Sequence, residues 1–261
     1  MLQKFKEHIH INFPFLKDKK LLIAISGGLD SVVLAHLLFE LNFTTSLAHC
    51  NFQLRAKESD LDEEFVKLCS QKTSNQIFTK KFTTEEFAKE KKLSTQIAAR
   101  ELRYHWFQEL IAQHNFDFVL TAHHADDNLE TFLINLTRGS GLDGFTGIPK
   151  INGNIVRPLL AFSREEILAY AKANNIKWRE DASNASTKYI RNKIRHQIVP
   201  VLKEINPNVL ETFSKTSEHL QQSKQIIEDR IANISAKIIT SENSILKIDI
   251  DKIRQLSHSK A

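Results

Sequence analysis

Cysteine and long apolar runs are scarce in this sequence. Its two cysteines, Cys50 and Cys69, form no Cys-x-x-Cys pair. A disulfide framework, a zinc ribbon and an iron–sulfur site are therefore not indicated, because each needs several cysteines at characteristic spacings. No apolar run approaches the roughly 20 residues of a membrane span, and the opening MLQKFKEHIHINFPF lacks the apolar core of a signal peptide. These absences predict a cytoplasmic protein with no membrane association.

The composition is that of a folded protein with more than one part. The chain has 261 residues, of which 41% are hydrophobic and 26% charged. That length is ample for a large core and exceeds the size of one typical domain. We predict a main catalytic domain at residues 1–205 and a helical appendage at residues 206–261. The net charge of +5 is compatible with a polyanionic partner without requiring one.

Glycine is also scarce, and its placement is informative. Two of the seven glycines lie in the turn SGGLDS at residues 26–31, and four others fall within the nine residues 139–147. The turn follows the apolar run Leu21–Ile25 and precedes leucines at helical spacing, so it joins a buried strand to a helix. Amides that open a helix attract phosphate. We interpret this turn as a phosphate-binding loop, the alternative being a plain glycine turn.

Asp30 determines which kind of phosphate loop this is. No lysine follows the glycines, so the turn is not the G-x-x-x-x-G-K-[ST] loop that grips a γ-phosphate. A carboxylate beside phosphate groups repels them unless a hard cation lies between. The sequence therefore predicts that Asp30 binds Mg²⁺.

Strand-like and helix-like segments alternate along the chain. Strands are expected at residues 21–25, 44–49, 76–82, 116–122 and 154–160, and capped helices after Ser59, Ser94 and Ser163. This alternation predicts an α/β fold with a doubly wound parallel sheet, whose ligand lies at the carboxyl ends of the strands. Beyond Pro207 the pattern is helical to about Lys237.

A polar cluster follows the strand expected at residues 116–122. In the run HHADDNLE at residues 123–130, the side chains of His123, Asp127 and Glu130 fall on one face of a helix. Histidines and carboxylates also suit a divalent metal site, and a capped helix start without chemistry is the plain alternative. The position at the carboxyl end of a strand favours a ligand site.

Positive charge gathers beyond residue 177. Seven basic and two acidic residues lie between Lys177 and Lys203. A helix is expected from Thr187 to Val199, with Pro200 interrupting it. Its basic face is interpreted either as a solvated surface or as a surface that follows RNA phosphates. The glycine-rich segment at residues 138–149 is expected to form a mobile loop over the cleft.

Taken together, the motifs resemble those of the tRNA(Ile)-lysidine synthetases, a family of PP-loop ATP pyrophosphatases. The segments are SGGLDS (26–31), AARELRY (98–104), LTAHHADDNLET (120–131), RGSGLDGFTGIP (138–149), RPLL (157–160) and EDASN…YIRNKIR (180–195). They occur in the family's order and approximate spacing over about residues 20–200. Ser186 departs from the family, which usually has an aspartate there. The chain also ends before the family's usual tRNA-binding C-terminal domain is complete.

The resemblance implies a two-step reaction that uses ATP and Mg²⁺. ATP adenylates the C2 oxygen of the wobble cytidine in tRNA(Ile) with a CAU anticodon, and the ε-amine of L-lysine then displaces AMP. The implied catalytic residues are Asp30, Arg103, Asp127 and Arg195. Those implied to bind ATP are Ser26, Gly27, Gly28, Leu29, Asp30, Ser31 and Arg103, with Mg²⁺ on Asp30. Lysine binding is expected from His123, Asp127 and Glu130, and tRNA binding from Arg138, Lys188, Arg191, Lys193 and Arg195. A homodimer is left open.

Three other functions are weighed against this one. An NAD- or GMP-type synthetase would share the phosphate loop but not the RGSGLDGF segment at residues 138–145. A PP-loop tRNA thiolase would normally need a sulfur-carrying cysteine or a cluster site, which Cys50 and Cys69 do not offer. A non-catalytic RNA-binding module would explain the basic segment but would leave Asp30, Asp127 and Glu130 without a role.

Overall fold

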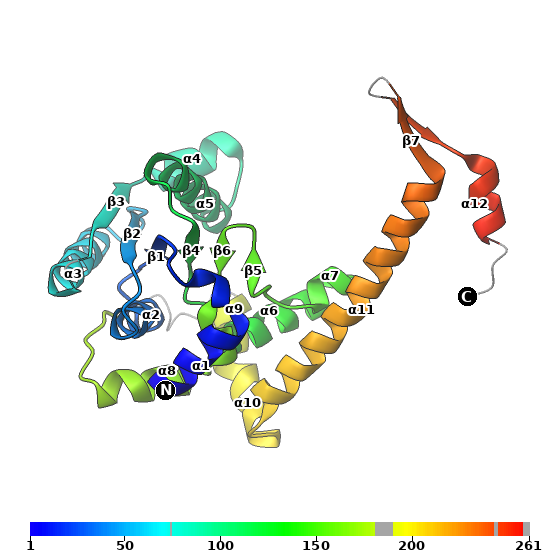
Figure 1. The fold of residues 1–261 in the computed structure, drawn as a ribbon. Coiled ribbons are helices and arrows are strands. Elements are labelled where there is room, and N and C mark those ends of the chain that lie inside the picture. Colours follow the sequence, from blue (N-terminus) through cyan, green and yellow to red (C-terminus); the bar gives the residue numbers. More distant parts are fainter. Residues whose placement is uncertain (74, 181–189, 243–244, 258–261) are drawn as a thin grey trace.

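The computed structural model describes residues 1–73, 75–180, 190–242 and 245–257 (Figure 1). Its centre is a six-stranded sheet in the order β3-β2-β1-β4-β6-β5, in which every neighbouring pair is parallel except β5 and β6. The strands are β1 (Leu21–Ala24), β2 (Thr45–Asn51), β3 (Ile77–Lys81), β4 (Phe118–Leu120), β5 (Ile151–Asn152) and β6 (Ile155–Val156). The predicted doubly wound parallel sheet is confirmed.

The last predicted strand is the one that differs most from the structure. Residues 154–160 form only the short strand β6, followed by a 3₁₀ helix at Pro158–Ala161. Pro158 has no backbone N–H to donate to a ladder and fits the first turn of a helix. The antiparallel edge strand β5 was not predicted.

Helices cover both faces of the sheet because the strand side chains alternate. Leu21 and Ile23 of β1 pack into a core with α1 (Leu2–Asn12), α2 (Leu29–Glu40) and α8 (Arg164–Ala173). Leu22 points the other way, into a core with α5 (Thr95–His114). β1 pairs with β2 on one side and β4 on the other, so the chain reverses its winding there. In a doubly wound sheet this switch point is where a ligand binds.

Three helix starts test the capping predictions. Ser163 caps α8 as predicted, and its hydroxyl accepts a hydrogen bond from the Glu166 N–H at 3.1 Å. Ser94 caps α5 as predicted, and its hydroxyl accepts a hydrogen bond from the N–H of Ile97 at 3.3 Å. Ser59 is not a cap, because α3 (Lys57–Thr73) begins two residues earlier. The Ser59 hydroxyl instead accepts a hydrogen bond from the Arg55 N–H at 3.1 Å. The helix α4 (Thr84–Lys91) was not predicted.

Pro200 does not interrupt its helix. The chain runs from α9 (Ile190–Lys193) through a π-helical turn (Ile194–Ile198) into α10 (Val199–Ile205). Proline tolerates the first turn of a helix, because the N–H it lacks has no partner there. The widened turn ends directly before α10, so Pro200 falls in the first turn of that helix.

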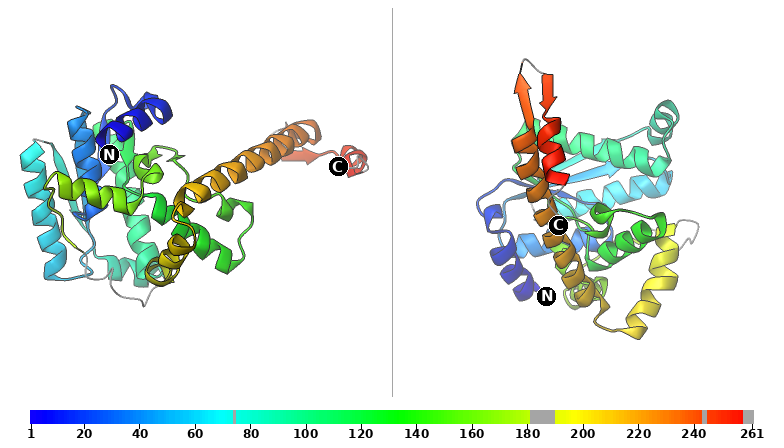
Figure 2. Two further views of the ribbon diagram at one scale, coloured as in Figure 1. Left: turned by 90° about the horizontal axis from the view of Figure 1, so that it is seen from below. Right: turned by 90° about the vertical axis from the view of Figure 1, so that its right-hand side faces the viewer.

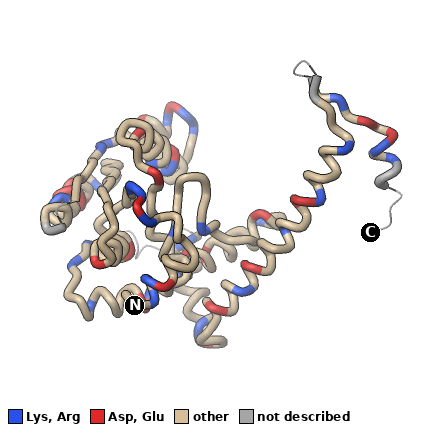
Figure 3. Tube along the Cα trace, in the orientation of Figure 1, with Lys and Arg blue, Asp and Glu red and all other residues tan. Residues whose placement is uncertain are grey.

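The carboxyl-terminal part is mainly one long helix, α11 (Val209–Ile238), followed by the hairpin of β7 (Ile239–Glu242) and β8 (Ile245–Ile248) and by α12 (Ile250–Ser257). Phe213 of α11 packs with Leu129, Ile194 and Val199. The far half extends away from the sheet (Figure 2), and acidic and basic positions alternate along it (Figure 3). The division at residue 205 stays a prediction. Among the described helices, none has the length and apolarity that crossing a bilayer would need.

Candidate active site

The turn between β1 and α2 has the geometry of an anion-binding loop. Gly27 has a φ of +89°, and a Cβ atom there would lie 3.3 Å from the Val66 Cγ2 atom of α3. The Ser31 hydroxyl donates to the Gly28 carbonyl at 2.9 Å, and the Ser26 N–H donates to the Ser31 hydroxyl at 3.2 Å. The N-cap of α2 is Gly28, which has no side chain to cap the helix. The two serines therefore fix the loop, while the first amides of α2 stay available to an anion.

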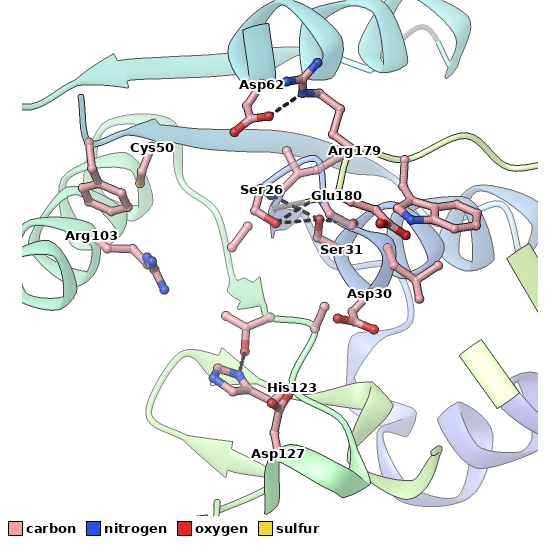
Figure 4. Close-up of a pocket in the computed structure, with 18 of the residues that line it drawn as sticks. Ser26, Asp30, Ser31, Cys50, Asp62, Arg103, His123, Asp127, Arg179 and Glu180 are labelled. Carbon is pink, nitrogen blue, oxygen red and sulfur yellow. Dashed lines mark hydrogen bonds and ion pairs between the residues drawn. The ribbon is translucent and has the colours of Figure 1, made fainter. Parts of the chain in front are cut away.

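A cavity of about 820 Å³ opens over this loop and over the carboxyl end of β4 (Figure 4). Guanidinium groups dominate the charged side chains that line it. The arginines are Arg55, Arg103, Arg164, Arg179, Arg191 and Arg195, and the carboxylates are Asp30, Asp62, Asp127 and Glu180. Arginine forks suit phosphate and carboxylate groups, so this surplus of positive charge favours a polyanionic ligand.

Asp30 reaches into the cavity from the first turn of α2. Its Oδ1 atom is buried and has no hydrogen-bond partner among the described residues, while Oδ2 lies 3.8 Å from the His124 Nε2 atom. Burial raises the pKa of Asp30, and the charge of His124 only partly opposes this. No group of three metal-binding side chains occurs in the described part of the chain. A carboxylate with an oxygen that has no described hydrogen-bond partner fits Mg²⁺, which proteins commonly hold with one or two carboxylates and the substrate's phosphates.

His124 and Asp127 build the start of α6 (Ala125–Arg138). His124 is its N-cap, and the Asp127 carboxylate accepts a hydrogen bond from the His124 N–H at 3.1 Å. Burial disfavours a charged His124, but Asp127, Asp126 and Asp30 outweigh it and raise the pKa of this imidazole. His124 and Asp127 therefore do form a capped helix start, which was one interpretation of this cluster. Asp127 also lines the cavity.

His123 has the opposite electrostatic environment. Burial, aided by the charges of Arg157, Arg191 and Arg103, lowers the pKa of His123 to about 4. Its Nδ1 atom lies 3.0 Å from the Thr121 hydroxyl. The imidazole that lines the cavity is therefore neutral near pH 7 and is a weak base.

Glu130 lies beneath two arginines of the 190–198 helical segment. The Arg195 guanidinium donates to both Glu130 oxygens, at 2.6 and 2.9 Å, and Arg191 donates at 3.1 Å. Arg195 also donates to the Asp127 Oδ1 atom at 2.9 Å. Glu130 has a side chain that is 1% exposed and it does not line the cavity. It anchors the arginines that do.

A second arginine cluster, Arg55 and Arg179, joins the phosphate loop to the neighbouring elements. The Arg179 N–H donates to the Gly27 carbonyl at 2.9 Å, and its guanidinium donates to Asp62 at 2.5 Å and to Glu58 at 2.6 Å. Arg55 donates to the other Asp62 oxygen at 2.6 Å. The loop is thereby fastened between α3 and residues 178–180. The sequence carries no local signal of these roles, because Arg179 and Asp62 are 117 positions apart.

Comparison with known proteins identifies the family. A PP-loop domain model matches residues 1–202. A tRNA(Ile)-lysidine synthase of Chlorobaculum tepidum is 35% identical over 260 residues, which is 98% of this chain and 78% of that protein. The chain belongs to the tRNA(Ile)-lysidine synthase family.

Other members of the tRNA(Ile)-lysidine synthase family are longer. The protein of Bacteroides thetaiotaomicron is 42% identical over 244 residues, which is 94% of this chain and 56% of that protein. One member of Porphyromonas gingivalis is 46% identical over 205 residues, which is 78% of this chain and 45% of that protein. The chain thus spans about half the length of these curated relatives. A solved U34-tRNA thiolase, NcsA from Methanococcus maripaludis, shares the fold with a TM-score of 0.68, at 18% identity over 85% of this chain and 80% of that one.

The structure brings together most of the residues that the tRNA(Ile)-lysidine synthase resemblance implied. Ten of them line one cavity: Ser26, Gly28, Leu29, Asp30, Ser31, Arg103, His123, Asp127, Arg191 and Arg195. Gly27 and Glu130 lie behind its wall, and Arg138 and Lys193 are exposed outside it. Lys188 and Ser186 lie outside the described residues. The roles of all these residues stay predictions.

One part of the cavity wall is largely apolar. Ala48, Cys50, Phe52 and Phe107 line it, and the Arg103 guanidinium lies 5.2 Å from the centre of the Phe52 ring. Burial raises the pKa of the Cys50 thiol to about 12. A thiol of this kind is not ionised at neutral pH and is a poor nucleophile.

Proposed function

We propose that the chain catalyses the ATP-dependent joining of L-lysine to C2 of the wobble cytidine in tRNA(Ile) with a CAU anticodon. The products are lysidine, AMP and pyrophosphate. One observation carries this proposal: an arginine-rich cavity of about 820 Å³ sits over the phosphate loop, and its lining includes Asp30, one of whose oxygens has no hydrogen-bond partner among the described residues. The family membership supports the same substrates.

We place the triphosphate of ATP on the loop of residues 26–31. The amides that open α2 would bind its oxygens, and Arg103 and Arg195 would neutralise the charge that develops at the α-phosphorus. Mg²⁺ would be held by Asp30 and would supply charge neutralisation between that carboxylate and the phosphates. In this step the C2 oxygen of the cytidine forms a bond to the α-phosphorus and pyrophosphate leaves.

The second step needs lysine with an uncharged amine. Its ε-ammonium has a pKa near 10.4 in water, so a nearby group must take a proton before the nitrogen can attack C2. Asp127 and the neutral His123 would bind the ammonium, and the Asp127 carboxylate would accept its proton. A bond then forms between the lysine nitrogen and C2, and AMP leaves with the former C2 oxygen. Glu130 would join this site only if Arg191 and Arg195 released it.

Recognition of the tRNA is proposed for the basic side chains near the cavity. Arg191 and Arg195 border the cavity, and Arg138 and Lys193 are exposed to solvent. Such side chains would contact the backbone of the anticodon loop, while the cytidine leaves its stack to enter the cavity. Lys188 is also proposed to contact the tRNA, because it lies in the same basic segment of the sequence.

The test is AMP release from ATP, measured with tRNA(Ile) bearing CAU, with and without lysine. We expect AMP release to need both substrates and to fall by about 100-fold or more in Asp30→Ala. The matched control is Asp229→Ala, an exposed aspartate on α11. Full turnover by Asp30→Ala would refute the role of Asp30. AMP release without tRNA would favour a small-molecule synthetase.

Sulfur transfer, the chemistry of a tRNA thiolase, is not favoured. The likeness to the solved thiolase is a likeness of fold, and the raised pKa of Cys50 disfavours the thiolate that sulfur transfer would need. A cytoplasmic location and a homodimer stay predictions. Light scattering coupled to size-exclusion chromatography would test the second.

A further inference from the structure

A second cavity, of about 230 Å³, lies between α1, the start of α6 and the first half of α11. Its lining includes the buried Arg157, the partly exposed Lys150 and the amide of Asn128. It is separate from the candidate active site and shares no lining residue with it. A volume of this size holds several water molecules or one small ligand.

Arg157 is the feature that singles out this cavity. The residue is only 4% exposed. Among the described residues, no carboxylate lies within 4.0 Å of its guanidinium. One guanidinium nitrogen donates to the Pro149 carbonyl at 2.7 Å. The Nε atom is buried and has no hydrogen-bond partner among the described residues. Buried charges in proteins are nearly always paired, so this cation calls for an anion.

The surroundings of Arg157 reinforce its charge. Lys150 also lines the cavity, and its only described carboxylate partner is the half-exposed Glu218 at 3.2 Å. The amide of Asn128 and the hydroxyl of Ser214 add neutral hydrogen-bonding groups. The lining therefore carries two cationic side chains against one carboxylate.

We propose that this second cavity binds a phosphate group through Arg157 and Lys150. A tetrahedral oxyanion in the cavity would accept charge-assisted hydrogen bonds from the Arg157 guanidinium and from Lys150. The group could belong to free inorganic phosphate or to the backbone of an RNA, since both present the same oxygens. This site goes beyond the proposed reaction and is tested by binding rather than by turnover.

The test follows the Arg157 Nε–Hε signal of the full chain by ¹H–¹⁵N NMR, assigned from its loss in Arg157→Lys. Inorganic phosphate is titrated against chloride at constant ionic strength. We expect a saturable shift of this signal, and binding about tenfold or more weaker in Lys150→Gln, which leaves the buried arginine in place. The matched control is Arg230→Gln, an exposed arginine on α11 that should not change the affinity.

A second arm uses a single-stranded RNA oligonucleotide. If the RNA shifts the Arg157 Nε–Hε signal and inorganic phosphate competes with the RNA, the bound group belongs to an RNA backbone. If inorganic phosphate alone shifts the signal, the ligand is a small anion. A shift that is linear and equal for phosphate and chloride would mean that water alone satisfies Arg157, and would overturn the proposal. Unchanged affinity in Lys150→Gln would do the same. If Arg157→Lys does not fold, the signal is assigned by triple-resonance NMR on the wild-type chain.

Discussion

Glu130 and its two arginines give an asymmetric stability prediction. The side chain of Glu130 is 1% exposed, whereas those of Arg191 and Arg195 are 41% and 23% exposed. Glu130→Gln leaves two arginines that reach water, and Arg195 keeps its bond to Asp127. We expect a loss of about 1–2 kcal/mol in the free energy of unfolding.

Removing both arginines should cost more. In the double variant Arg191→Gln, Arg195→Gln, the Glu130 carboxylate stays buried without a cation, and such a change typically costs about 3–5 kcal/mol. With a urea m-value of about 3 kcal/mol per molar, the midpoint of unfolding should fall by roughly 1–1.7 M. Asp127 also loses a donor in this variant, which acts in the same direction.

The assay is equilibrium urea unfolding followed by far-ultraviolet circular dichroism, with equal m-values as the check that the midpoints can be compared. The control is Glu211→Gln, which removes an exposed ion pair with Lys215 and should leave the midpoint unchanged. If Glu130→Gln is destabilised as much as the double arginine variant, the reasoning from burial is refuted. The glutamate would then owe its effect to something other than charge pairing.

Two further predictions concern the loop and the histidine pair. Gly27→Ala should lower the free energy of unfolding by about 1–2 kcal/mol, because a side chain at positive φ is strained and would press on Val66. It should also weaken binding of an ATP analogue measured by calorimetry. The control Gly28→Ala, at a φ of −75°, should have smaller effects, and equal effects of the two variants would contradict this explanation. In an NMR titration the His123 ring should stay neutral down to a pKa of about 4, while His124 should titrate above its usual 6.5. In the unfolded chain both rings have a pKa near 6.5. The free energy of unfolding should therefore fall as pH drops from about 6.5 to 4, because His123 resists protonation in the folded chain. The stabilisation from His124 should be complete below pH 6.5 and should be lost as pH rises through its raised pKa. Matching pKa values for the two rings would be inconsistent with this structure.

Much of the fold could be predicted because its signals are local. The apolar run of β1, the leucines of α2 and the Ser94 cap each specify their element within a few residues, and these elements formed where expected. The failures also have local causes. Ser59 looked like a cap, but the chain already turns at Arg55, and Pro158 converted the end of a predicted strand into a 3₁₀ helix.

The candidate site was only half predictable. The sequence by itself determined the phosphate loop, because two glycines, two serines and the start of a helix lie within six consecutive residues. Only the tertiary structure decided which charges meet: Arg179 with Asp62, His124 with Asp30, and Arg195 with Glu130. The physical reason is that backbone conformation depends on near neighbours, whereas the burial and pairing of a charge depend on which distant segments the folded sheet places beside it. His123, Asp127 and Glu130 share a helical spacing, and packing alone put two of them on the cavity wall and the third beneath the arginines.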